Sequence, residues 1–226
     1  MLSFRLARVP VRVHGSFLLV GIVLGWGFGR GGGAGQASQL ALLVGWLAVV
    51  FVSVLAHELG HALVARAFGL TPQIDLHGMG GTTSYADPEG RVTSRRRIAI
   101  SLAGPGAGFF LGGVVLAVTL LRLPLEVKRF EPIVNALVWV NLYWGALNLL
   151  PILPLDGGMV LESLAGESRA RKVSVVLGVV LCVLALAYGW MWPAILLVLF
   201  VVTNVQRLRG DAQERGDEPE RTRLRE

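Results

Sequence analysis

Long runs of apolar residues alternate with short polar segments along this chain. A helix that spans a bilayer needs about 20 mostly apolar residues. The first run is short for a span unless it extends back through Val11 and Val13. The pattern predicts an all-α membrane protein with about six transmembrane helices. They lie at about 16–28, 40–68, 98–121, from about 133 onward through two prolines, 173–188 and 193–205.

The segment between the second and third predicted spans has a different pattern. From Leu70 to Thr93, single apolar residues such as Ile74 and Leu76 alternate with glycines, threonines and serines. Such alternation is typical of a β-hairpin, and extended backbone at membrane depth must lie against protein or line a wet cavity. We predict a small re-entrant β-hairpin here, with a plain cytoplasmic loop as the alternative.

Composition and charge agree with a lipid environment. Hydrophobic residues make up 54% of the chain and charged residues 16%, whereas an average soluble domain has about 25% charged residues. The net charge is +6, but the cations lie between the apolar runs and form no soluble basic face, which argues against nucleic acid as a partner. The single cysteine, Cys182, is expected to be a packing residue.

The distribution of lysine and arginine predicts the orientation in the membrane. With the N-terminus inside, the inner segments hold 17 of the 21 basic residues, and the outer segments hold only Arg30, Arg122, Lys128 and Arg129. Because cytoplasmic loops carry the excess of cations, we predict a multi-pass protein of the cell membrane with both termini in the cytoplasm. Residues 1–206 are predicted to form the integral membrane core, and the charged residues 207–226 a disordered tail.

A metal-binding pattern lies late in the second predicted span, where the sequence reads His57-Glu58-Leu59-Gly60-His61. Residues four apart share one face of a helix, so both imidazoles can bind one Zn²⁺. Glu58 lies beside them to take a proton from a metal-bound water. A charged residue inside a bilayer costs about 2.5 kcal/mol or more, so we interpret Glu58 as chemically functional.

A hydrolytic zinc site usually has three protein ligands and one water. The position six residues after His61 is Ala67, which excludes a third histidine there. The only acidic residue in the predicted spans besides Glu58 is Asp156, which follows two helix-breaking prolines and precedes two glycines. Asp156 is therefore our predicted third ligand, and an aspartate that only caps the next helix is the alternative. Other candidates, all in the polar hairpin region, are His77, Glu89 and Asp75.

Together, the motif from His57 to His61 and the segment from Asn148 to Gly158 resemble the site-2 protease family of intramembrane zinc proteases. The resemblance covers roughly residues 10–206. It implies that His57, His61 and Asp156 bind one zinc ion per chain and that Glu58 activates water. It also implies that Asn148 orients the substrate or supports the oxyanion, for which a buried asparagine bridging helices is the alternative reading.

The resemblance further implies an activity and its partners. The expected enzyme is a zinc metalloendopeptidase that lies in the lipid bilayer and hydrolyses peptide bonds in or near the transmembrane segments of membrane proteins, close to the cytoplasmic face. The expected substrates are proteins with a single span. A membrane metal-ion carrier and a non-catalytic scaffold are the alternative functions, and the sequence gives no indication of the oligomeric state. In the third predicted span, the stretch Gly104-Pro105-Gly106-Ala107-Gly108 resembles a Gly-Pro motif of the family, and its small residues are expected to allow close helix packing.

Overall fold

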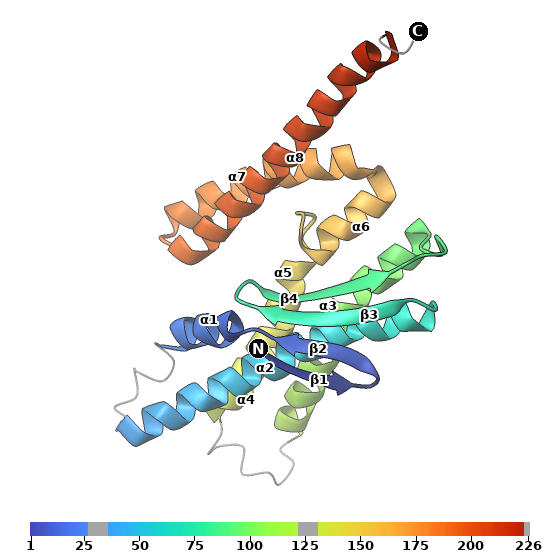
Figure 1. Ribbon diagram of the computed structural model, residues 1–226. Helices are drawn as coiled ribbons and strands as arrows, with labels where there is room; N and C mark the ends of the chain where they lie inside the picture. Colours follow the sequence, from blue (N-terminus) through green and yellow to red (C-terminus); the bar gives the residue numbers. More distant parts are fainter. Residues whose placement is uncertain (27–35, 122–130, 224–226) are drawn as a thin grey trace. The chain divides into compact units, whose positions relative to one another are not determined.

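The computed structural model describes residues 1–26, 36–121 and 131–223. The chain divides into two compact units, Met1–Asn148 and Leu149–Glu226. Figure 1 shows that the described residues are mostly helical and that one small sheet lies in the first unit. The elements of the first unit are β1 (Leu2–Leu6), β2 (Val9–Val13), α1 (Gly15–Gly25), α2 (Gln36–Ala67), β3 (Thr71–His77), β4 (Gly80–Ala86), α3 (Ser94–Leu120), α4 (Glu131–Trp139), the π-helix η3 (Val140–Trp144) and α5 (Gly145–Asn148).

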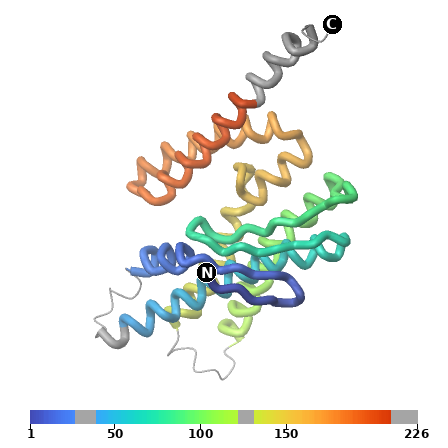
Figure 2. Tube along the Cα trace, in the orientation of Figure 1, coloured from blue at the N-terminus to red at the C-terminus, as the bar shows by residue number. Residues whose placement is uncertain are grey.

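The sheet has four strands in the order β1-β2-β3-β4. β1 and β2 form an antiparallel hairpin, and β2 runs parallel to β3, with Val11 opposite Ile74 and Val13 opposite Leu76. The N-terminal segment therefore lies alongside a strand that is far from it in sequence, as the blue and cyan parts of the trace show (Figure 2). β3 and β4 form a second antiparallel hairpin.

The sequence prediction of an all-α fold is wrong about the N-terminus. Val9, Val11 and Val13 alternate with Pro10 and Arg12, and this period of two puts the three valines on one face of a strand. Pro10 lacks a backbone N–H and disfavours a helix interior. Val11 and Val13 therefore belong to β2 and do not extend the first span. The valines enter a buried cluster between the sheet and the helices, with Ile74, Leu76, Ala62 and Phe17.

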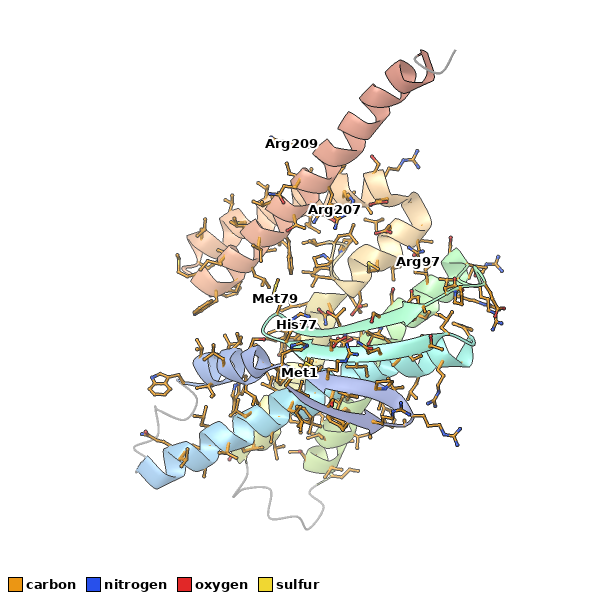
Figure 3. All side chains as sticks on the ribbon, viewed as in Figure 1. Met1, His77, Met79, Arg97, Arg207 and Arg209 are labelled. Atoms are coloured by element: carbon orange, nitrogen blue, oxygen red, sulfur yellow. The ribbon has the colours of Figure 1, made fainter. Side chains whose placement is uncertain are left out.

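The hairpin predicted after the second span is present as β3 and β4. Figure 3 marks His77 and Met79 at the turn between the two strands. Alternation along β3 buries Pro72, Ile74 and Leu76 and leaves Gln73, Asp75 and His77 half-exposed. The position of this hairpin relative to a bilayer stays a prediction.

Four helical segments of the described residues are long and apolar enough to cross a membrane, where the sequence predicted six. They are Gln39–Ala67 and Ser94–Leu120 in the first unit, and Glu167–Ala187 and Met191–Gly210 in the second. The other two predicted spans are shorter helices, since α1 has 11 residues and α4 has nine before the chain changes to the π-helix η3. Residues 27–28 of the first predicted span lie outside the described residues. The length and apolar composition of these four helices are those of an integral membrane protein.

The second unit contains α6 (Asp156–Ala165), α7 (Glu167–Ala187) and α8 (Met191–Arg223). α7 and α8 pack side by side (Figure 1) around a small cluster of Cys182, Ala185 and Ala194. Cys182 is buried and unbridged, which confirms it as a packing residue. α8 continues beyond the sixth predicted span into the charged segment 207–226, for which a disordered tail stays a prediction.

The close approach of α2 and α3 depends on Gly60. A Cβ atom at this position would overlap the carbonyl oxygen of Ala103 and lie 2.9 Å from the Cβ of Ala107. The two helices therefore pack almost backbone to backbone, as small residues allow in membrane proteins.

We expect Gly60→Ala to lower the thermal unfolding midpoint of the detergent-solubilised protein. The added methyl must push α3 away, and overpacking typically costs about 1–3 kcal/mol. Alanine gains only about 1 kcal/mol over glycine in a helix. The control is Gly113→Ala in α3, where nothing lies within 4 Å of the new Cβ, and it should be neutral or stabilising. Equal midpoints for Gly60→Ala and the unmodified protein would contradict the close contact.

Candidate metal centre

Two histidines on one face of α2 bring their ring nitrogens together. His57 and His61 are one helical turn apart, and their Nε2 atoms lie 3.1 Å from each other. The ring planes are nearly perpendicular, at 80°. Two nitrogens bound to one tetrahedral zinc ion at about 2.0–2.1 Å lie about 3.3 Å apart. The spacing of the two imidazoles therefore fits a shared zinc ion.

The backbone of α3 determines the tautomer of His61. The Nδ1 atom of His61 lies 2.7 Å from the carbonyl oxygen of Ile100, inside the protein. A carbonyl oxygen can only accept, so Nδ1 carries the hydrogen and donates it. The lone pair of Nε2 is then available to a metal, which is the usual arrangement for a histidine ligand.

Gly104 in α3 leaves the space beside the two imidazoles. A Cβ atom at Gly104 would overlap Nε2 of His61 and lie 2.8 Å from Nε2 of His57. Any side chain here would fill the position that a shared metal ion needs. Sequence reasoning singled out Gly104 for helix packing, and the space that it leaves beside the histidine nitrogens is a second reason for a glycine here.

Glu58 is oriented by β4, although the two are 25 residues apart. Only 5% of Glu58 is exposed. The hydroxyl of Thr83 lies 2.7 Å from Oε2 of Glu58 and 3.0 Å from the carbonyl oxygen of the same residue, so it can donate to either. Gly81 provides the room, because a Cβ atom there would lie 2.6 Å from Oε1 of Glu58. The carboxylate is thus held between the hairpin and α2.

A polar pair lies one helical turn before His57. Ser53 is on the same face of α2, and its Oγ accepts a hydrogen bond of 2.8 Å from Nδ2 of Asn141. Asn141 is buried in the π-helix η3 and also donates to the carbonyl oxygen of Leu137. π-Helical turns often occur at functional sites. The pair fixes α4 and η3 to the helix that carries the histidines.

The remaining predicted residues lie in different parts of the chain. Asn148 is half-buried at the end of α5 in the first unit, and Asp156 is half-buried in the first turn of α6 in the second unit. A carboxylate is favoured at this end of a helix by the macrodipole. Two histidines and one aspartate are a donor set that suits zinc.

The other candidate ligands have different partners. His77 forms a hydrogen bond of 2.9 Å with Thr82, and Glu89 pairs with Arg91. Asp75 accepts from Gln73 at 2.8 Å and lies 3.7 Å from Nε2 of His14. Each of these three side chains thus has a polar partner in the sheet or in the connection to α3.

Sequence reasoning missed Thr83 and Gly81 as neighbours of Glu58. Both lie in the alternating segment that predicted the hairpin, but the sequence does not tell which face of β4 meets α2. Ser53 carried a usable signal, because it precedes His57 by four residues and shares its helix face.

Comparisons with known proteins support a common family. The model of "Peptidase family M50" matches residues 45–128 and 123–187. The chain is 27% identical to "Zinc metalloprotease MJ0392" of Methanocaldococcus jannaschii, over 87% of this chain and 56% of that protein. It is 32% identical to "Putative zinc metalloprotease sll0528" of Synechocystis sp., over 83% of this chain and 49% of that protein. The chain thus spans about half the length of these curated relatives.

A larger share of the matched protein is covered for one further relative and for a solved structure. "Putative zinc metalloprotease Rip2" of Mycobacterium tuberculosis is 30% identical, with 68% of this chain and 71% of that protein covered. The structure of the "Site-2 Protease from Methanocaldococcus jannaschii" matches with a TM-score of 0.57 and 26% identity, over 91% of this chain and 94% of that one. Zinc is the cofactor that the relatives' names and the histidine and aspartate donors both indicate. The chain therefore belongs to peptidase family M50, the site-2 protease family of membrane zinc metalloproteases.

Proposed function

We propose that this protein is an intramembrane zinc metalloprotease that cleaves membrane proteins in or near their transmembrane segments. The observation that carries the proposal is the convergence of His57 and His61 beside Gly104, together with the hydrogen bond from Thr83 that orients the carboxylate of Glu58, the residue after His57. A metal-ion carrier needs the imidazoles but has no need of an oriented carboxylate beside them. Hydrolysis needs both, and this favours the protease over the carrier.

The proposed metal site has His57, His61 and Asp156 as its ligands, one Zn²⁺ per chain. Asp156 supplies the oxygen donor that completes the three-ligand set of a hydrolytic zinc site. The support for this ligand set comes mainly from the two histidines, whose Nε2 atoms are 3.1 Å apart.

The chemistry divides between the metal and the protein groups. Bound zinc would lower the pKa of its water to about 7 and polarise the scissile carbonyl. Glu58 would take the proton from the attacking water and return it to the leaving nitrogen. Its hydrogen bond from Thr83 keeps one carboxylate oxygen occupied and leaves the other for the proton. Asn148 would donate its amide hydrogen to the oxygen that becomes negative in the transition state.

The substrate is proposed to bind as an added strand. β4 pairs only with β3 among the described strands, so its other edge is open to a further strand. Thr83 on β4 contacts Glu58, so an extended peptide at this edge would pass close to the catalytic carboxylate. A transmembrane helix of a single-span protein must unwind to bind in this way, which frees its peptide bonds for attack.

The proposed cleavage site is close to the cytoplasmic face of the cell membrane. His57 and His61 lie in the last third of α2, which ends with Arg66 in its final turn. The segment that follows holds Arg91, Arg95, Arg96 and Arg97. This excess of cations supports a cytoplasmic location for this end of α2, and the distribution of cations along the whole chain supports the same location for both termini.

Glu58→Gln should abolish cleavage while zinc stays bound. Loss of a general base typically lowers the rate about 10²–10⁴-fold. The measurement is cleavage of a model single-span substrate in proteoliposomes, with zinc content determined on the same samples. Glu89→Gln, in the exposed loop between β4 and α3, is the matched control and should retain full activity. Equal cleavage by Glu58→Gln and the unmodified enzyme would reject the mechanism.

Thr83→Val should reduce kcat about tenfold without changing the zinc content. It removes one hydrogen bond to a charged group, typically worth about 1.5–3 kcal/mol, and leaves Glu58 less well oriented. Thr83→Ser keeps the hydroxyl and should retain most of the activity. Thr82→Val, which loses only the contact with His77, is the control. The idea fails if Thr83→Val and Thr82→Val have the same kcat.

Asp156→Asn should weaken zinc binding at least about 100-fold, because the neutral amide replaces a charged ligand. Competition with a chromogenic chelator measures the affinity in detergent without any substrate. Asp75→Asn, which changes a carboxylate on the sheet, should bind zinc as the unmodified protein does. An unchanged affinity in Asp156→Asn would exclude Asp156 as a ligand.

A further inference from the structure

The loop that leads to Asp156 forms few hydrogen bonds between its own backbone groups. Pro151 and Pro154 have no N–H, and the loop's own hydrogen bonds are Ile152 N–H to Leu150 and Leu155 N–H to Ile152. Leu153, between the two prolines, is buried. Its N–H and carbonyl both need partners, because an unpaired buried peptide group is costly.

Two buried side chains of the second unit supply these partners. The Leu153 N–H donates to Oγ of Ser174 in α7 at 2.8 Å, and Nδ2 of Asn204 in α8 donates to the Leu153 carbonyl at 2.8 Å. Ser174 is fully buried and Asn204 is 2% exposed. The backbone of this one residue is thus held by α7 through its N–H and by α8 through its carbonyl oxygen.

The orientation of Asn204 is determined by its partners. Its Nδ2 atom donates one hydrogen to Leu153 and the other to the carbonyl oxygen of Phe200, both at 2.8 Å. A flipped amide would turn its oxygen toward two carbonyl oxygens. In the observed orientation, Oδ1 is buried without a hydrogen-bond partner in the described part of the chain. An apolar residue would avoid this cost. The contribution of Asn204 is therefore its hydrogen bond to the Leu153 carbonyl oxygen.

The opposite side of the same loop rests on the first turn of α6. A Cβ atom at Gly157 would lie 2.6 Å from the Leu150 carbonyl oxygen, and one at Gly158 would lie 2.5 Å from the Leu153 nitrogen. These glycines directly follow Asp156. A shift of the Leu153 peptide therefore presses on the backbone that carries the aspartate.

From this geometry we infer that Ser174 and Asn204 are positioning residues for Asp156. They fix the Leu153 peptide to α7 and α8, and the loop in turn fixes the first turn of α6. Any motion of the α7–α8 pair is then transmitted to the proposed metal ligand. The inference rests on the proposed role of Asp156, and its test therefore has one readout that does not involve the metal.

The first readout is amide hydrogen exchange of residues 149–158 in the full-length protein. Ser174→Ala and Asn204→Leu should each raise the exchange rate of the Leu153 amide at least about tenfold, because each removes one of the two side-chain hydrogen bonds to the backbone of Leu153. The controls are Ser163→Ala and Thr203→Val, each of which removes a bond to the carbonyl four residues before it without touching Leu153. Ser174→Thr, which keeps the hydroxyl, should restore slow exchange.

The second readout is zinc affinity by chelator competition. Both positioning variants should bind zinc about tenfold more weakly, an effect in the range of outer-shell changes at metal sites, and the controls should not. Should Asn204→Leu fail to fold, Ser174→Ala alone decides the outcome. Unchanged exchange at Leu153, or equal increases in the controls, would overturn the inference. So would normal zinc affinity in both variants when Asp156→Asn binds zinc weakly. If Asp156→Asn itself binds zinc normally, the proposed ligand set fails instead.

Discussion

Two imidazole nitrogens held 3.1 Å apart on one partly buried helical turn are the constraint on which the first unit depends. An α-helix puts the fourth residue back on the same face, but it does not aim two rings at one point. The Ile100 carbonyl holds one ring of the pair, and the missing side chain of Gly104 leaves room at the point where they meet. α3 must therefore pass very close to α2, and Gly60 allows that approach.

Polar groups inside an apolar protein must find partners within the protein. In the three cases that follow, the hydrogen bond also positions a side chain, a helix or a loop. Thr83 binds Glu58, Asn141 binds Ser53, and the Leu153 peptide is bound from two helices. None of these pairs connects neighbours in sequence. In a lipid environment such hydrogen bonds replace water, and they also determine which rotamer or which peptide orientation persists. Structure and reactivity are thus set by the same few contacts.

The sequence was informative wherever the physical signal was local. Apolar runs identified the helical segments, the spacing of His57 and His61 identified the pair of imidazoles, and alternation after Leu70 identified the β3–β4 hairpin. Hydropathy could not separate two kinds of secondary structure that have the same apolar composition. The sequence left open an extension of the first span through Val11 and Val13, because an apolar strand and the end of an apolar helix look alike over five residues. In the described residues, only four of the six predicted spans are helices long enough to cross a membrane. The other two are shorter because apolar composition does not show where a helix ends.

By itself, the sequence determined the class of protein, the helix that carries the histidines and the type of metal chemistry, because hydropathy and helical spacing act within one stretch of chain. Only the tertiary structure decided that β2 runs beside β3, that Thr83 reaches Glu58 and that Gly104 faces the histidine nitrogens. These contacts join residues 25 or more positions apart. They depend on which face of one element packs against another, and the tertiary packing of all the elements determines this.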